Sequence, residues 1–205
     1  ASIIAGLRAP DQANVFADLR DEAQRALLPE LTPETSADIL EKLGEAEVMV
    51  GGGITSDIMI PYNILGAQKL DRLTALARRV ERLTVAADSA YTIRGLSAAA
   101  AAAGVKLGVV VEVETGSNRT GVTPQEAVEL GQLIEDSPGL ELRGIMGFPT
   151  PPTVRPLIQE ILDLFDRHSL PHPIVSGGST GYALQAHETP ELTEYRSGEY
   201  PVGGY

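Results

Sequence analysis

A segment rich in glycine and hydroxyl residues, Ser176-Gly177-Gly178-Ser179-Thr180-Gly181, follows directly after the short apolar run 173–176. Glycines let the backbone approach an anion closely, and successive N–H groups with nearby hydroxyls can surround a phosphate. The alternative is an ordinary glycine-rich turn. Because the segment follows a late strand, where barrel proteins often bind phosphate, we favour the phosphate site.

Two arginines and two tyrosines are further candidates, and one of each follows an apolar run. Arg119 lies in the stretch 112–121 after the most apolar run of the chain, and Tyr62 comes just after the run that begins at residue 57. A guanidinium group there can bind a carboxylate, a phosphate or a phenolate oxygen, although a solvated loop arginine and a structural tyrosine are the alternatives. Arg196 and Tyr200 flank a glycine turn near the end of the chain, and the pattern alone assigns them no role.

Alternating strands and helices are predicted to carry these residues. Continuous apolar runs at 57–62, 83–88, 107–113, 142–148 and 173–176 indicate strands covered on both faces, as in a parallel sheet. Helical spacing marks 70–80, the alanine-rich stretch ending at Gly104, the segment opened by the capping box Thr123-Pro124-Gln125-Glu126, and 154–165. Asp88, at the end of the second run, is interpreted as the cap of the next helix.

The repeat of strand and helix predicts the α/β fold class, as an incomplete (β/α)₈ TIM-like barrel. No Gly-x-Gly-x-x-Gly motif supports a dinucleotide-binding sheet instead. No strand is predicted before residue 57, so we expect the early strands to be missing. The predicted organisation is an atypical helical N-terminal segment, 1–44, followed by a partial barrel domain, 45–205.

Composition excludes several classes of protein. The formal net charge is -12 and no basic stripe is present, which argues against a nucleic-acid partner. No apolar run is long enough to span a membrane, and the chain has no cysteine, which fits a reducing, cytoplasmic compartment. The three histidines, at 168, 172 and 187, are not spaced as a metal motif, and His168 and His172 are interpreted as structural.

Several segments in the same order resemble the alanine-racemase-like (fold type III) barrels that bind pyridoxal phosphate (PLP), and most of all the D-threonine aldolase and D-serine dehydratase branch. They are EAEVMVGGGITSDIMIPYNILGAQKL, LTVAADS, VVVEVETGSNRTGV, LELRGIMGF, PIVSGGSTG and ELTEYRSGEY. The resemblance implies that Gly177, Gly178, Ser179 and Thr180 hold the cofactor phosphate. It also implies roles for four further residues around the cofactor ring: Tyr62, Arg119, Arg196 and Tyr200.

The resemblance implies a PLP-dependent lyase that acts on small β-hydroxy D-amino acids, with zinc in the complete family member and a homodimer as one assembly. The family's Schiff-base lysine belongs to a first strand, and none of the chain's lysines, Lys42, Lys69 and Lys106, has that position. The zinc domain that follows the barrel in the family is also not recognised. We therefore expect an incomplete, inactive chain without an identified catalytic residue; the alternative is a non-catalytic PLP- or phosphate-binding barrel.

Overall fold

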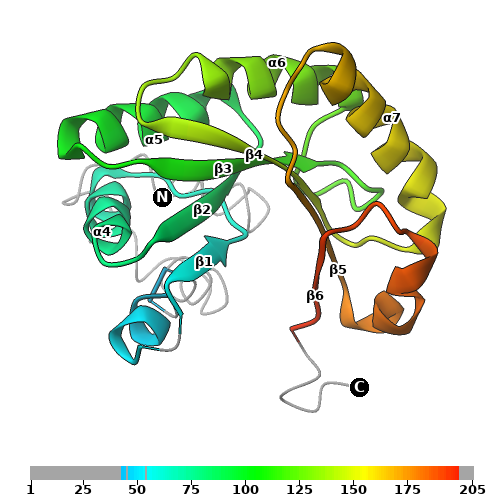
Figure 1. Cartoon of the computed structure of the whole chain (residues 1–205), viewed down its shortest axis with the longest axis horizontal. Helices are drawn as coiled ribbons and strands as arrows, with labels where there is room; N and C mark the ends of the chain where they lie inside the picture. Colours follow the sequence, from blue (N-terminus) through cyan, green and yellow to red (C-terminus); the bar gives the residue numbers. More distant parts are fainter. Residues whose placement is uncertain (1–42, 45, 54, 199–205) are drawn as a thin grey trace, which may run out of the picture.

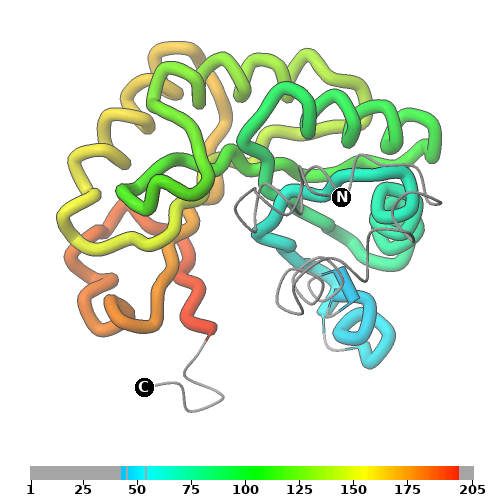
Figure 2. Tube along the Cα trace, turned by 180° about the vertical axis from the view of Figure 1, so that it is seen from behind, coloured from blue at the N-terminus to red at the C-terminus, as the bar shows by residue number. Residues whose placement is uncertain are grey.

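The computed structural model describes residues 43–44, 46–53 and 55–198, and these contain one sheet of six parallel strands in sequence order. The strands are β1 (Asp57–Ile60), β2 (Arg82–Ala87), β3 (Leu107–Val113), β4 (Leu140–Gly147), β5 (Ile174–Gly178) and β6 (Glu194–Arg196). The sheet curls, and its helices lie along the outer, convex side (Figures 1 and 2). The described part is therefore an open half-barrel, which confirms the predicted α/β, TIM-like class.

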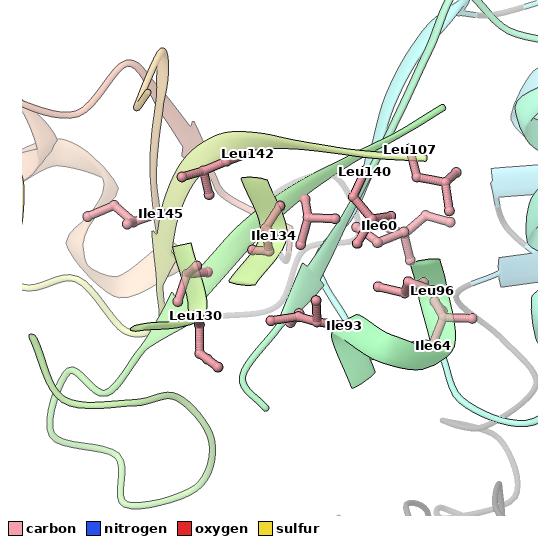
Figure 3. Close-up of a cluster of buried hydrophobic side chains, with 14 of the residues drawn as sticks. Ile60, Ile64, Ile93, Leu96, Leu107, Leu130, Ile134, Leu140, Leu142 and Ile145 are labelled. Carbon is pink, nitrogen blue, oxygen red and sulfur yellow. The ribbon is translucent and has the colours of Figure 1, made fainter. Parts of the chain in front are cut away.

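The convex face of the sheet carries the main core. Val109, Val111 and Val113 alternate along β3 toward the helices, and they pack with Leu142 and Ile145 of β4. Side chains from α5 (Ala90–Ala103) and α6 (Pro124–Glu135) complete this layer, as Figure 3 shows for Ile93, Leu96, Leu130 and Ile134. The layer holds the strands at fixed spacing, so the residues at their carboxyl ends are held on a rigid support.

The helices begin and end where local chemistry allows. Ser89 caps α5 by accepting the N–H of Thr92, and Gly104 ends that helix in the left-handed conformation. The predicted capping box is present at α6, where Thr123 accepts the N–H of Glu126 and the Glu126 carboxylate accepts the N–H of Thr123. The cap of α5 corrects the interpretation of Asp88, which precedes the capping residue.

The remaining elements complete the repeat. They are α4 (Ala67–Ala77), α7 (Arg155–Arg167) and the 3₁₀ helices η3 (Pro152–Val154) and η4 (Thr180–Glu188). Residues 43, 44 and 46–51 are also helical and contribute Leu43 and Ala46 to the core. Most of the predicted N-terminal segment 1–44 lies outside the described residues, so its helical character stays a prediction.

A β-bulge in β4 changes which face its side chains meet. Val109 pairs with Leu142 and Val110 pairs with Gly144, so Arg143 is an extra residue in the ladder. Gly144 has φ 126°, and a Cβ there would lie 1.9 Å from the carbonyl oxygen of Ile174 on β5. Glycine is therefore required at this point. Beyond the bulge, Ile145 still faces the helices and Met146 faces the concave side.

Within the described residues, no helix is both long enough and apolar enough to cross a membrane.

Candidate functional site

A cavity of about 560 Å³ opens at the carboxyl ends of the strands, on the concave side of the half-barrel. Its size is within the range of small-molecule sites. The lining comes from the ends of four strands and the loops after them: Met59, Pro61, Tyr62, Glu112, Arg119, Met146, Phe148, Glu194, Tyr195, Arg196 and Gly198. Catalytic and binding residues of parallel barrels lie at this end of the sheet.

Strand alternation places a buried carboxylate of β3 in the cavity. Val109, Val111 and Val113 face the helices, so Val110 and Glu112 face the concave side. Glu112 is only 6% exposed, and its carboxylate accepts a hydrogen bond of 2.6 Å from the Thr120 hydroxyl. Burial raises the pKa of Glu112, and the nearby Asp88 raises it further. The Thr120 hydrogen bond and the two cavity arginines act in the opposite direction.

Arg119 is carried by a loop that folds back on β3. Glu114 accepts the N–H groups of Gly116 and Asn118, which tightens the turn. Gly121 has φ 97°, and a Cβ there would lie 2.5 Å from the backbone of Val113 and Glu114, so the return of the chain depends on glycine. The Arg119 guanidinium lies 5.4 Å from the ring centre of Phe148, within the range of a cation–π interaction.

Arg196 is held at the base of the cavity by neutral acceptors. Its Nε donates to the Ser176 hydroxyl at 2.9 Å and its Nη2 donates to the Gly147 carbonyl at 2.7 Å. Burial lowers the pKa of this guanidinium, whereas Glu194 and Glu112 favour its charged form. Among the described residues, no carboxylate lies within 4 Å of either Arg196 or Arg119. The two cations can therefore accept an anionic ligand.

The first half of the glycine-rich segment, Ser176 to Gly178, forms the end of β5 rather than a loop, and Thr180 begins η4. Gly177 and Gly178 belong to the strand. Thr150 fixes this end, because its hydroxyl accepts the Gly178 N–H at 2.8 Å and its N–H donates to the Gly178 carbonyl at 2.9 Å. A side chain at Gly177 would collide with Leu192 and Thr150, so tight packing alone explains that glycine. A Cβ at Gly178 would instead lie 3.2 Å from Arg196 Nη1.

Ser179 connects the strand to η4 in an unusual backbone conformation. Its φ is 152° and its ψ is 128°, a region that side chains rarely adopt. Its N–H donates to the Arg196 carbonyl at 3.2 Å, and its own carbonyl accepts the Tyr195 hydroxyl at 2.9 Å. Strain of this kind is often found at binding sites. The N–H groups of Gly178 and Ser179 are both hydrogen-bonded within the chain, and η4 begins at the next residue, Thr180.

The structure brings together three of the predicted residues, since Tyr62, Arg119 and Arg196 all line the cavity. The glycine segment does not line the cavity, but Gly178 lies close to Arg196, which does. Tyr200 lies outside the described residues. Their binding roles stay predictions. Five cavity residues were not predicted from the sequence: Glu112, Met59, Met146, Phe148 and Tyr195. Glu112 could have been found, because it is the single glutamate inside the apolar run LGVVVEV.

The two described lysines do not line the cavity. Lys106 precedes β3, at the opposite end of the sheet, and pairs with Glu141 at 2.8 Å. Lys69 lies in α4, where burial and then the neighbouring Arg72 lower its pKa to about 8. Lys42 lies outside the described residues. The described lining of the cavity therefore offers two guanidinium groups and aromatic side chains but no amine.

The three histidines, all in the described part of the chain, lie outside the cavity lining. His172 lies 2.8 Å from Asp166 and meets the Phe165 ring edge to face, and its structural role stays a prediction. His168 contacts Gln132 at the far end of α7. Among the described residues, no group of three or more histidine, aspartate or glutamate side chains could hold a metal ion.

Comparison with known proteins identifies the family of this chain. The family model for the alanine racemase N-terminal domain matches residues 39–205. A 3-hydroxy-D-aspartate aldolase of Paracoccus denitrificans is 30% identical over 175 residues, which cover 78% of this chain and 45% of the relative.

Two solved structures share the fold. The D-threonine aldolase of Filomicrobium marinum superposes with a TM-score of 0.66 at 29% identity, over 82% of this chain and 50% of its own. The D-threo-3-hydroxyaspartate dehydratase of Delftia sp. HT23 has the same TM-score of 0.66 at 25% identity, over 82% of this chain and 49% of its own. The chain thus spans about half the length of the relatives that it matches.

Proposed function

The chain belongs to the alanine racemase N-terminal domain family, and from this premise we propose that it forms the PLP-binding half-barrel of a lyase that acts on β-hydroxy D-amino acids. The proposed class is the D-threonine aldolase or D-serine dehydratase type. The observation that carries the proposal is the pair Arg119 and Arg196, which line one cavity at the carboxyl ends of the strands without a carboxylate within 4 Å in the described structure.

The cavity residues fit distinct parts of the cofactor. The resemblance assigns the phosphate to the glycine segment 177–180, which lies outside the cavity lining but contacts Arg196 through Gly178 and Ser179. Arg196 would meet the pyridine ring or the phosphate, and Arg119 would meet the ring oxygen or the substrate carboxylate. Tyr62 and Phe148 offer aromatic walls. When bound, PLP supplies an electron sink for cleavage next to the α-carbon of an amino acid.

Two family components have no candidate among the described residues. No lysine lines the cavity, and no metal-ligand cluster is present in this part of the chain. The zinc that we associate with the complete family member would therefore be bound by residues other than these; one variant of D-threo-3-hydroxyaspartate dehydratase has been solved in a metal-free form. We expect the 205-residue chain to bind PLP reversibly and to leave D-threonine and D-serine unchanged.

Titration of the chain with PLP, followed by absorbance and by calorimetry, tests the proposal. Saturable binding at one site, weakened about tenfold or more in Arg196→Met, is expected from the loss of a charged hydrogen-bond donor. Arg167→Met is a matched control, because Arg167 lies on α7 and outside the cavity. Equal affinity in the wild type and in Arg196→Met would contradict the assignment of the cavity.

A non-catalytic phosphate-binding barrel is the second candidate, and the absence of a lining lysine in the described structure favours it. Competition separates the two candidates. If the cavity recognises the pyridine ring as well as the phosphate, ribose 5-phosphate should compete with PLP far more weakly than pyridoxine 5′-phosphate does. Equal competition by both ligands would support a general phosphate site.

A further inference from the structure

The buried carboxylate of Glu112 carries one inference beyond the proposed function. Glu112 lies on β3 and lines the cavity together with both arginines. It is hydrogen-bonded to Thr120, the residue next to Arg119. We propose that Glu112 is a positioning residue, which anchors the Arg119 loop through Thr120 and limits the positive charge that the cavity offers to an anionic ligand. Its effect on ligand binding rests on the proposed function, whereas its effect on the loop does not.

The anchor follows from the contacts around the loop. The Thr120 hydroxyl donates to Glu112 at 2.6 Å, and the Val122 N–H donates to the backbone carbonyl of the same glutamate at 3.0 Å. The loop is therefore tied to one residue of β3 at two points, one through a side chain and one through the backbone. Because Thr120 is adjacent to Arg119, a fixed Thr120 limits the positions that the guanidinium can reach over the cavity.

The charge effect follows from the surroundings of the carboxylate. Asp88 after β2 raises the pKa of Glu112, while Arg119 in the loop and Arg196 on β6 lower it. Tyr62, Glu194 and Tyr195 also line the cavity. Neither arginine is within 4 Å of the carboxylate, so these interactions act through space across a site that a ligand could occupy. An ionised Glu112 repels a bound anion, and a protonated Glu112 does not.

The two roles can be separated by substitution. Glu112→Gln keeps an oxygen that can accept the Thr120 hydrogen bond but removes the charge. Thr120→Val removes the hydroxyl and keeps both the side-chain shape and the glutamate. Thr120→Ser restores a hydroxyl at the same place and serves as the conservative control.

Amide hydrogen exchange in the unliganded protein tests the anchor. The reporters are three N–H groups. Those of Gly116 and Asn118 donate to the Glu114 carboxylate, and that of Val122 donates to the Glu112 carbonyl. We expect exchange about tenfold faster in Thr120→Val, the effect of losing one hydrogen bond, and near wild-type exchange in Thr120→Ser and Glu112→Gln, which both keep a donor and an acceptor. Wild-type exchange throughout the loop of Thr120→Val would overturn the inference, whatever the cavity binds.

PLP affinity as a function of pH tests the charge effect. Removing one negative charge in Glu112→Gln should tighten binding about threefold to tenfold at neutral pH. The gain should shrink as the pH falls and Glu112 becomes protonated in the wild type, and protonation of the PLP phosphate cancels in the ratio of the two affinities. A ratio that is independent of pH would overturn this role. If no variant binds PLP, the proposed function fails, and the exchange experiment still decides the positioning role.

Discussion

Thr150 provides the most direct test of how the end of β5 is organised. It is 3% exposed, and its hydroxyl accepts the Gly178 N–H at 2.8 Å. Thr150→Val replaces that hydroxyl with a methyl group of similar size, so the N–H of Gly178 loses its acceptor in a buried place. The lost acceptor costs about 1–3 kcal/mol of unfolding free energy. For a chain of this length, each kcal/mol lowers Tm by about 2–4 °C, so we expect a fall of roughly 4–8 °C for a central value of about 2 kcal/mol.

Urea unfolding followed by circular dichroism measures the change, with the midpoint expected to fall and the slope expected to stay the same. Thr150→Ser is the control, because it keeps the hydroxyl and removes only the methyl group. If serine destabilises the fold as much as valine does, packing of the methyl group dominates and the hydrogen-bond argument is wrong. PLP affinity should fall in Thr150→Val as well, since the strand end supports Ser179 and the start of η4.

Three further predictions concern stability, pH and covalent chemistry. Gly144→Ala should cost at least about 3 kcal/mol or prevent folding, because its Cβ would lie 1.9 Å from a carbonyl oxygen of β5; Gly95→Ala in α5, where the nearest atom is 3.9 Å away, should be neutral or stabilising in the same denaturation assay. The raised pKa of Glu112 means that the folded state binds its proton more tightly than the unfolded state does. The unfolding free energy of the wild type should therefore fall relative to that of Glu112→Gln as the pH rises above the ordinary pKa of 4.5. Parallel curves of unfolding free energy against pH for the two proteins would contradict this. Borohydride reduction in the presence of PLP should label no cavity residue. Any slow adduct should form at Lys69 before Lys106, because the pKa of Lys69 is about 8. A stoichiometric adduct found by mass spectrometry elsewhere in the described chain would contradict this.

The sheet was predictable where apolar runs are long and continuous. The run 107–113 forms β3 as predicted, because a short continuous apolar run, six of whose seven residues are buried, favours a strand covered on both faces. The last strand, β6, was not predicted, since Glu194-Tyr195-Arg196 is short and polar and forms a strand only because β5 lies beside it. Its pairing with β5 is a tertiary effect that no local pattern encodes.

The two cavity arginines were predicted from the sequence, but the buried carboxylate of Glu112 was not. Arg119, Arg196 and Tyr62 all reached the cavity, because each follows or ends a strand. Glu112 was passed over, although its position on the opposite face from Val111 and Val113 follows from alternation along a strand. The loop predicted at Gly177 was wrong, because glycine signals a turn by default and here serves close packing inside a strand.

The bulge at Arg143 has a meaning for how the length of this chain can vary. Arg143 is the residue without a partner on β3, and its Nε is buried without a hydrogen-bond partner. Leu142 before it and Ile145 beyond the bulge both pack in the helix-side core. A deletion of Arg143 would pair Leu142 and Gly144 with successive residues of β3 and leave Met146 toward the cavity. A deletion of Ile145 would turn Met146 into the helix layer and remove it from the cavity wall. We expect these two sites, which are two residues apart in one strand, to differ in their tolerance of a one-residue deletion, with Met146 kept in the cavity lining only when Arg143 is lost.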